Sequence, residues 1–176
     1  MAGANNIPER LINFRVYSDN DDLLGLATVD LPEIEAMSDT ISGAGIAGEL
    51  ETPTIGHYAA MESTFNWRTV TEHYFKLCAQ KSFQVDVRGS IQLYDAANGE
   101  YKTVALRVTM RLVNKNFGLG SLEPAAAMDS EQTFEVSYIK LYLGGKERFE
   151  IDKLNYIAKF DGVDLLASVR ADLGLN

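Results

Sequence analysis

The 176-residue chain has a single cysteine, Cys78, so no disulfide can form within it, and folding in a reducing compartment is the default expectation. Its two histidines, His57 and His73, do not stand at metal-site spacing from each other or from the cysteine. No stretch is long and apolar enough for a transmembrane helix, and the polar segment Met1–Asn6 lacks the apolar region of a signal peptide. These absences favour a protein without disulfides, bound metal or a membrane span.

Basic residues are also scarce. The chain has 16 Lys and Arg residues against 25 Asp and Glu residues, which gives a net charge of −9. A general nucleic-acid-binding protein needs a basic face, so this balance argues against that class. The hydrophobic content of 46% and the charged content of 23% are typical of a globular protein, and we expect one domain over residues 1–176.

Motifs of enzymes and cofactor sites are absent from the sequence. Glu33 and Glu35 form a carboxylate pair of the kind that glycosidases use, but no second feature supports catalysis. Gly118-Leu119-Gly120 is not followed by the Lys and Ser or Thr of a phosphate loop. The acidic turn at 18–22 lacks the glycine and the closing glutamate of a calcium loop. We therefore expect a protein that is not an enzyme, with no catalytic residues, no metal and no cofactor.

The strongest pattern that is present is a pair of long alternating segments, Ser82–Tyr94 and Tyr101–Val113. Apolar and polar residues alternate along both, as in strands with one dry and one wet face. At ~3.3 Å per residue each strand is about 40 Å long. The turn signal Asn98-Gly99 joins them into a hairpin. Strands this long with a wet face suit a barrel or an assembled wall better than a small closed core.

The rest of the chain is predicted as mainly antiparallel β, a barrel or sandwich with one central α-helix and a short C-terminal helix. The central helix is expected at Val70–Gln80, with Thr69 and Glu72 as a capping box. The C-terminal helix is expected at Gly162–Leu173, capped by Asp161 and ended by Gly174. Further strands or extended segments are expected at Leu11–Tyr17, Leu23–Leu31, Glu33–Ile41, Tyr58–Trp67, Thr133–Gly144 with a bulge at Tyr138-Ile139, Glu147–Ile151 and Tyr156–Phe160.

The last third of the chain resembles a known family. Glu150-Ile151-Asp152, Asp161-Gly162-Val163-Asp164 and Arg170–Leu175 are similar to the C-terminal motifs of the major tail tube proteins of contractile-tail phages and R-type pyocins. The order of the upstream elements, with an Ala60-Met61-Glu62 strand before the helix and hairpin, also resembles that family.

The resemblance implies a structural subunit of a tail tube. Such subunits form hexameric rings in which each gives four strands to a continuous barrel, and the rings stack into a hollow tube inside a contractile sheath. The implied partners are further copies of the chain, the tail sheath protein, baseplate or tube-initiator proteins, a tape measure protein in the lumen, and DNA that passes without specific binding. The implied location is the virion tail or a phage-tail-like particle, assembled in the host cytoplasm.

A lumen is the expected environment of a set of polar residues on the wet faces. Acidic side chains facing the channel would repel phosphate and keep DNA from adhering. The alternative is a solvated outer face of a monomeric sheet. The residues expected in the lumen are Glu33, Glu35, Asp39, Glu62, Thr64, Arg107 and Arg111, with the arginines paired to these carboxylates, to neighbours in the ring, or to both.

The segment Gly43–Gly56 is predicted as a 14-residue loop that connects stacked rings. Loops of this length inside a compact domain are usually functional or disordered. Its apolar residues have little reason to persist in a free surface loop, so we expect them to dock on a neighbouring subunit. The residues expected to join the rings are Gly43, Gly45, Ile46, Gly48, Leu50, Glu51, Pro53 and Ile55.

Two alternatives remain open at the level of sequence. A monomeric β-barrel that binds a small ligand would place apolar residues inward around a pocket. The related tube of a type VI secretion system would share the tube architecture, although the C-terminal motifs favour the phage and pyocin branch.

Overall fold

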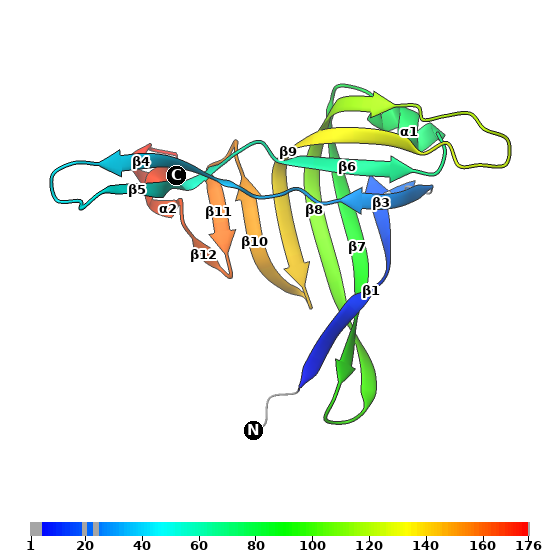
Figure 1. Ribbon diagram of the computed structural model, residues 1–176, viewed down its shortest axis with the longest axis horizontal. Coiled ribbons are helices and arrows are strands. Elements are labelled where there is room, and N and C mark those ends of the chain that lie inside the picture. The colour runs from blue at the N-terminus through cyan, green and yellow to red at the C-terminus, as the bar shows by residue number, and fades with distance from the viewer. Residues whose placement is uncertain (1–4, 19–20, 23–24, 176) are drawn as a thin grey trace.

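The computed structural model describes residues 5–18, 21–22 and 25–175 (Figure 1). The predicted turn at 18–22 and the start of the strand expected at Leu23 therefore lie partly outside the described residues. The described part of the chain is mainly antiparallel β with two short helices, as the sequence predicts. The elements are β1 Asn6–Ser18, β2 Asp21–Asp22, β3 Leu26–Asp30, β4 Ala36–Ser42, β5 Glu49–Tyr58, β6 Glu62–Trp67, α1 Glu72–Leu77, β7 Ser82–Asp95, β8 Glu100–Gly118, β9 Ser130–Leu143, β10 Lys146–Asp152, β11 Ile157–Phe160, β12 Val163–Asp164 and α2 Ala167–Asp172.

The predicted long hairpin is confirmed as β7–β8. The two strands pair without a register shift from Ser82 opposite Val113 to Tyr94 opposite Tyr101. Gly99 has a φ of 70° in the connecting turn, and its N–H donates to the carbonyl of Asp95 at 2.8 Å. A glycine is needed there because a side chain would disfavour this left-handed conformation.

One ten-stranded sheet contains most of the chain, in the order β12-β11-β10-β9-β8-β7-β1-β2, with β6 added to β9 and β3 added to β6. Along one edge of β9, β6 pairs with residues 130–135 and β10 with residues 138–143. The register between them shifts, because Arg111 of β8 pairs with Tyr138 whereas Leu112 pairs with Val136. Ser137 is therefore the extra residue of a β-bulge, close to the predicted position.

The hydrophobic core lies between the long strands and the arm formed by β3 and β6, which crosses them in Figure 1. Phe65 of β6 packs on Phe134 of β9, with ring centroids 4.9 Å apart. At the end of the core, the indole N–H of Trp67 donates to Gln132, and Gln132 donates to the carbonyl of Tyr74 in α1. This packing covers one face of the long sheet. Every second residue of the long strands points to the opposite face, which the core does not cover.

The central helix is shorter than predicted and begins two residues later. The side chain of Thr71, rather than Thr69, is the N-cap and accepts a hydrogen bond from the N–H of Tyr74 at 3.2 Å. Both threonines fit the local pattern, but the burial of Tyr74 and Leu77 fixes the register of the helix.

The C-terminal helix was predicted too long. Its expected first turn is instead the strand β12, in which Val163 and Asp164 pair with β11. Asp161 does not cap a helix; it has a φ of 45° and its carboxylate pairs with Arg148 at 3.0 Å. Gly174, with a φ of 68°, does end the helix as predicted.

The predicted 14-residue loop at Gly43–Gly56 is wrong. Only residues 43–48 connect strands, because Glu49–Tyr58 is the strand β5, paired with β4 in a separate two-stranded sheet. The glycines favour a loop in the sequence, but Gly56 is required by packing within the strand. A Cβ at this position would lie 2.5 Å from the side chain of Leu166. The β4–β5 hairpin extends away from the long strands (Figure 1).

Candidate functional site: the polar face and the β4–β5 hairpin

The uncovered side of the long sheet carries a continuous set of polar side chains, which we call the polar face. Residues directly opposite each other on neighbouring strands point to the same side, so the register defines its members. They include Arg15 and Tyr17 of β1, Gln84, Asp86 and Arg88 of β7, Arg107, Thr109 and Arg111 of β8, Tyr138, Lys140 and Tyr142 of β9, Glu147, Glu150 and Asp152 of β10, and Lys159 of β11.

Asp86 is the centre of the first ion-pair group on this face. It accepts hydrogen bonds from Arg107 at 2.7 Å, from Thr109 at 2.8 Å and from Arg88 at 2.9 Å. Burial alone would raise the pKa of Asp86, but the hydrogen bonds from these three donors outweigh it and hold the pKa below its usual value. The arginines extend above the carboxylate, with side-chain exposures of 58% for Arg88 and 50% for Arg107 against 13% for Asp86.

Glu150 is the centre of the second group. It accepts hydrogen bonds from Tyr138 at 3.0 Å and from Lys159 at 3.2 Å, and Lys140 lies 3.5 Å away. Burial and the hydrogen bond to Glu150 raise the pKa of Tyr138 to about 12. Burial opposes ionisation of Glu150 as well, yet the hydrogen bonds and the lysine charges keep its pKa below its usual value. Lys140 also pairs with Glu147 at 2.9 Å, so the group is a network rather than a single pair.

Further pairs extend this pattern at and beyond the C-terminal end of β10. Arg111 lies 3.8 Å from Asp152, whose side chain is 4% exposed, and its guanidinium stacks over the ring of Tyr138. Lys115 contacts Glu62 and Glu135, and Lys153 lies 3.7 Å from Glu135. The described charges of this side of the sheet are therefore largely paired within the chain.

Comparison with known proteins identifies the family. Residues 8–174 match the family model described as phage tail tube protein FII. The chain belongs to this phage tail tube family. A curated relative, the tail tube protein of Escherichia phage P2, is 26% identical over 174 residues, which cover 96% of this chain and 99% of the relative.

Solved structures show the same fold. In the extracellular contractile injection system PVC, the sheath/tube terminator in the extended state matches with a TM-score of 0.53 at 13% identity, over 77% of this chain and 96% of the other. The sheath–tube complex of the same system matches with a TM-score of 0.54 at 12% identity, over 77% and 91% of the two chains. The resemblance found in the sequence is thus confirmed, and the chain is a structural tail tube subunit.

The residues expected to face the lumen of the tail tube do not all lie together. Arg107 and Arg111 belong to the polar face, and Glu62 and Thr64 extend it because they are opposite Glu135 and Thr133. In contrast, Glu33 and Glu35 lie in the connection between β3 and β4, and Asp39 lies on β4 of the hairpin.

Within the chain, the expected pairing of the arginines is also different. Arg107 pairs with Asp86 and Arg111 lies near Asp152, so neither uses one of the four predicted carboxylates. The sequence analysis missed Asp86 and Glu150 as site residues. Their signals were available, because Asp86 is a polar position of the alternating strand and Glu150 belongs to the family motif.

The residues expected to join tail tube rings all lie in the β4–β5 hairpin. Gly43, Gly45, Ile46 and Gly48 are in its connection, and Leu50, Glu51, Pro53 and Ile55 are on β5. The apolar members are exposed, at 37% for Ile46, 53% for Leu50 and 66% for Ile55. A lone two-stranded hairpin is at best marginally stable in water, so this apolar area favours a docked partner.

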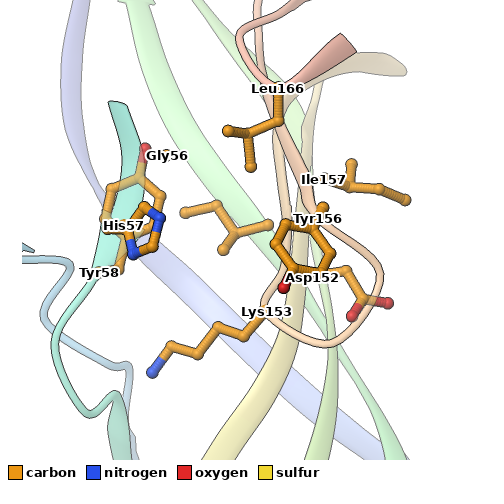
Figure 2. A pocket seen from close by; sticks show the side chains of 9 residues that line it. Gly56, His57, Tyr58, Asp152, Lys153, Tyr156, Ile157 and Leu166 are labelled. Carbon is orange, nitrogen blue, oxygen red and sulfur yellow. The ribbon is translucent and has the colours of Figure 1, made fainter. Parts of the chain in front are cut away.

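A small pocket lies where the hairpin meets the body of this tail tube subunit. Figure 2 shows His57 and Tyr58 of β5 facing Tyr156 and Leu166 across it. Its volume of about 130 Å³ is below the ~300–1,000 Å³ of typical ligand sites. Among the described residues, no three His, Cys, Asp or Glu side chains cluster as metal ligands. No helix in the described part of the chain is long and apolar enough to span a membrane.

Proposed function

We propose that the chain forms hexameric rings that stack into the inner tube of a contractile phage tail or phage-tail-like particle. The match to the tail tube family over residues 8–174 is the observation that carries this proposal. The chain acts as one structural domain without catalytic activity. It works in the virion tail after assembly in the host cytoplasm.

The edges of the sheet support ring closure. Among the described residues, the outer edge of β1 is paired only at Tyr17 and Ser18, by β2. At the opposite end of the sheet, β12 pairs with only Lys159 and Phe160 of β11. Unpaired strand edges template further pairing, and closure of strands from about six subunits into one barrel removes them.

The arrangement of the two sheet faces supports an orientation in the ring. The apolar face is covered by β3, β6 and α1, whereas the polar face is wet. The polar face then lines the water-filled channel, with Glu62, Thr64, Arg107 and Arg111 among its residues. The covered side faces outward toward the tail sheath protein, which the relatives' sheath–tube complexes favour as a partner. The channel holds a tape measure protein during assembly and later lets DNA pass without specific binding, and baseplate or initiator proteins start the tube.

The β4–β5 hairpin is the proposed connector between rings. Each exposed apolar side chain contributes roughly 1.5–3 kcal/mol when fully buried, and about six hairpins act together around a ring.

The test is electron microscopy of the purified protein and of the triple variant Ile46→Ser, Leu50→Ser and Ile55→Ser. These substitutions keep the backbone pairing of the hairpin and remove its apolar area. We expect the wild type to form long tubes and the variant to form rings without long tubes. Leu154→Ser, which changes a side chain 71% exposed in another turn, is the control and leaves tube length unchanged. A wild type that stays monomeric under every condition contradicts the tube, and long tubes of the variant contradict the hairpin's role.

A further inference from the structure

The charge on the polar face differs from that of the whole chain. The chain has a net charge of −9, yet among the described residues the ion pairs centred on Asp86, Glu147, Glu150 and Asp152 of the polar face join five cations to four carboxylates. The acidic excess therefore lies elsewhere on the molecule. If this face lines a channel, repulsion by an acidic wall does not explain how a polyanion passes.

The ion pairs have a layered geometry. Asp86, Glu150 and Asp152 are recessed, with side-chain exposures of 13%, 11% and 4%. Arg88 and Arg107 donate to Asp86 and Lys159 donates to Glu150, whereas Lys140 and Arg111 lie at ion-pair distances of 3.5 Å from Glu150 and 3.8 Å from Asp152. Pairs that are partly buried are screened by salt much less than exposed pairs, so they persist at physiological ionic strength.

Compensation of this kind removes the main driving force for binding nucleic acid. A protein gains affinity for a duplex when its free cations replace the counterions condensed on the phosphates. An arginine whose charge is already offset by its own carboxylate gains less from binding phosphate. A face of compensated cations therefore neither repels a duplex nor retains it.

We propose that the polar face is a charge-compensated surface past which duplex DNA slides without binding, with Asp86 and Glu150 as the residues that prevent adhesion. Asp86 contacts two arginines and Glu150 contacts two lysines, so the single negative charge of each offsets one positive charge and weakens the attraction of both of its partners for phosphate. This inference rests on the proposed function, because it takes the polar face as the wall of the channel. It adds the mechanism by which that wall stays non-adhesive.

The test measures binding of a labelled random-sequence duplex of about 30 base pairs, between about 50 and 200 mM salt, to the purified protein in solution and as tubes. We expect no measurable binding by the wild type. Asp86→Asn with Glu150→Gln removes two negative charges and so frees about two cations. This variant is expected to bind the duplex with a slope of log K against log salt of about −2, which is roughly a tenfold loss of affinity between about 50 and 200 mM salt. Glu123→Gln with Asp172→Asn makes the same change of charge at two exposed positions outside the polar face and the hairpin. It is the matched control, with binding expected to stay at the wild-type level.

A second pair of variants leaves the ion pairs intact, which covers the case in which the first variant does not fold. Gln84 is exposed opposite Arg111 on the polar face, and Gln80 is exposed beyond the end of α1. Gln84→Lys adds one uncompensated cation to the face and is expected to bind the duplex, whereas Gln80→Lys is not. Salt-dependent binding by the wild type, or equal behaviour of the two lysine variants, overturns the proposal. Absence of tubes in electron microscopy contradicts the proposed function instead, since the binding assay also works on the unassembled chain.

Discussion

Asp95 shows how a single residue holds the tip of the long hairpin in place. It lies at the end of β7 with its side chain 1% exposed, and it accepts hydrogen bonds from Lys102, from the side chain of Asn98 and from the N–H of Ala97. The hydrogen bonds from Lys102 and Asn98 are the main reason that the pKa of Asp95 falls to about 2. The folded chain therefore stabilises the ionised form of Asp95 more than the unfolded chain does.

We predict a specific pH dependence for Asp95→Asn. Because the folded pKa of about 2 is below the unfolded value of ~3.9, the carboxylate stabilises the fold fully above pH ~4 and progressively less as the pH falls toward 2. The difference in free energy of unfolding between wild type and variant should therefore shrink over that window in urea titrations. Asp161→Asn is the control, since it removes an exposed ion pair that contributes little. A difference that is constant from pH 7 to pH 2 contradicts the argument.

At the scale of single residues, the sequence alone predicts only some members of the polar face. Alternation placed Arg107, Arg111 and Asp86 on wet faces, because period two is a local property of a strand. It could not tell which carboxylate each arginine meets, since the pairs depend on the register between strands far apart in the chain. Glu33, Glu35 and Asp39 looked equivalent to the others because each also lies in an extended segment.

Among the elements, the β4–β5 hairpin is where local signals and tertiary structure disagree most. Four glycines and a proline predict a loop, yet Glu49–Tyr58 forms a strand. Pro53 is tolerated because β5 is an edge strand of a two-stranded sheet. The long hairpin, in contrast, was predictable to within a residue or two at most of its ends, because its alternation, its length and its Asn98-Gly99 turn all agree.

Gly56 offers a test at this scale. It has a φ of 69°, and a Cβ would lie 2.5 Å from the buried side chain of Leu166. Gly56→Ala should cost about 1–2 kcal/mol for the left-handed backbone and roughly 1–3 kcal/mol more for the clash. Gly45→Ala has a similar backbone demand, with a φ of 95° and nothing within 4 Å, so it should show only the first cost. Urea titration measures both, and equal losses would mean that the contact with Leu166 does not anchor the hairpin.

For the whole molecule, the outer edge of β1, which pairs among the described residues only with the short β2, is the feature that a single copy leaves unfinished. Ile7 and Ile12 on this strand are 47% and 53% exposed, although isoleucine is among the residues most often buried. Their exposure next to an unpaired strand edge is explained if a neighbouring subunit continues the sheet and covers them. In that case the apolar character of these two positions serves assembly and not the folding of a single chain.

We predict that Ile7→Lys with Ile12→Lys blocks ring closure and leaves the single chain folded. Neither side chain belongs to the buried core, so the free energy of unfolding of the monomer should change by less than about 0.5 kcal/mol, as is usual for surface substitutions. Two lysines at the edge should prevent a second sheet from pairing there, because the ammonium groups lose hydration on burial and repel one another around the ring. Leu122→Lys, at a side chain 87% exposed and away from β1, is the control with the same change of charge per substitution. Sedimentation velocity and electron microscopy should find monomers for the double variant and tubes for the control, and tubes of normal diameter from the double variant would remove β1 from the subunit interface.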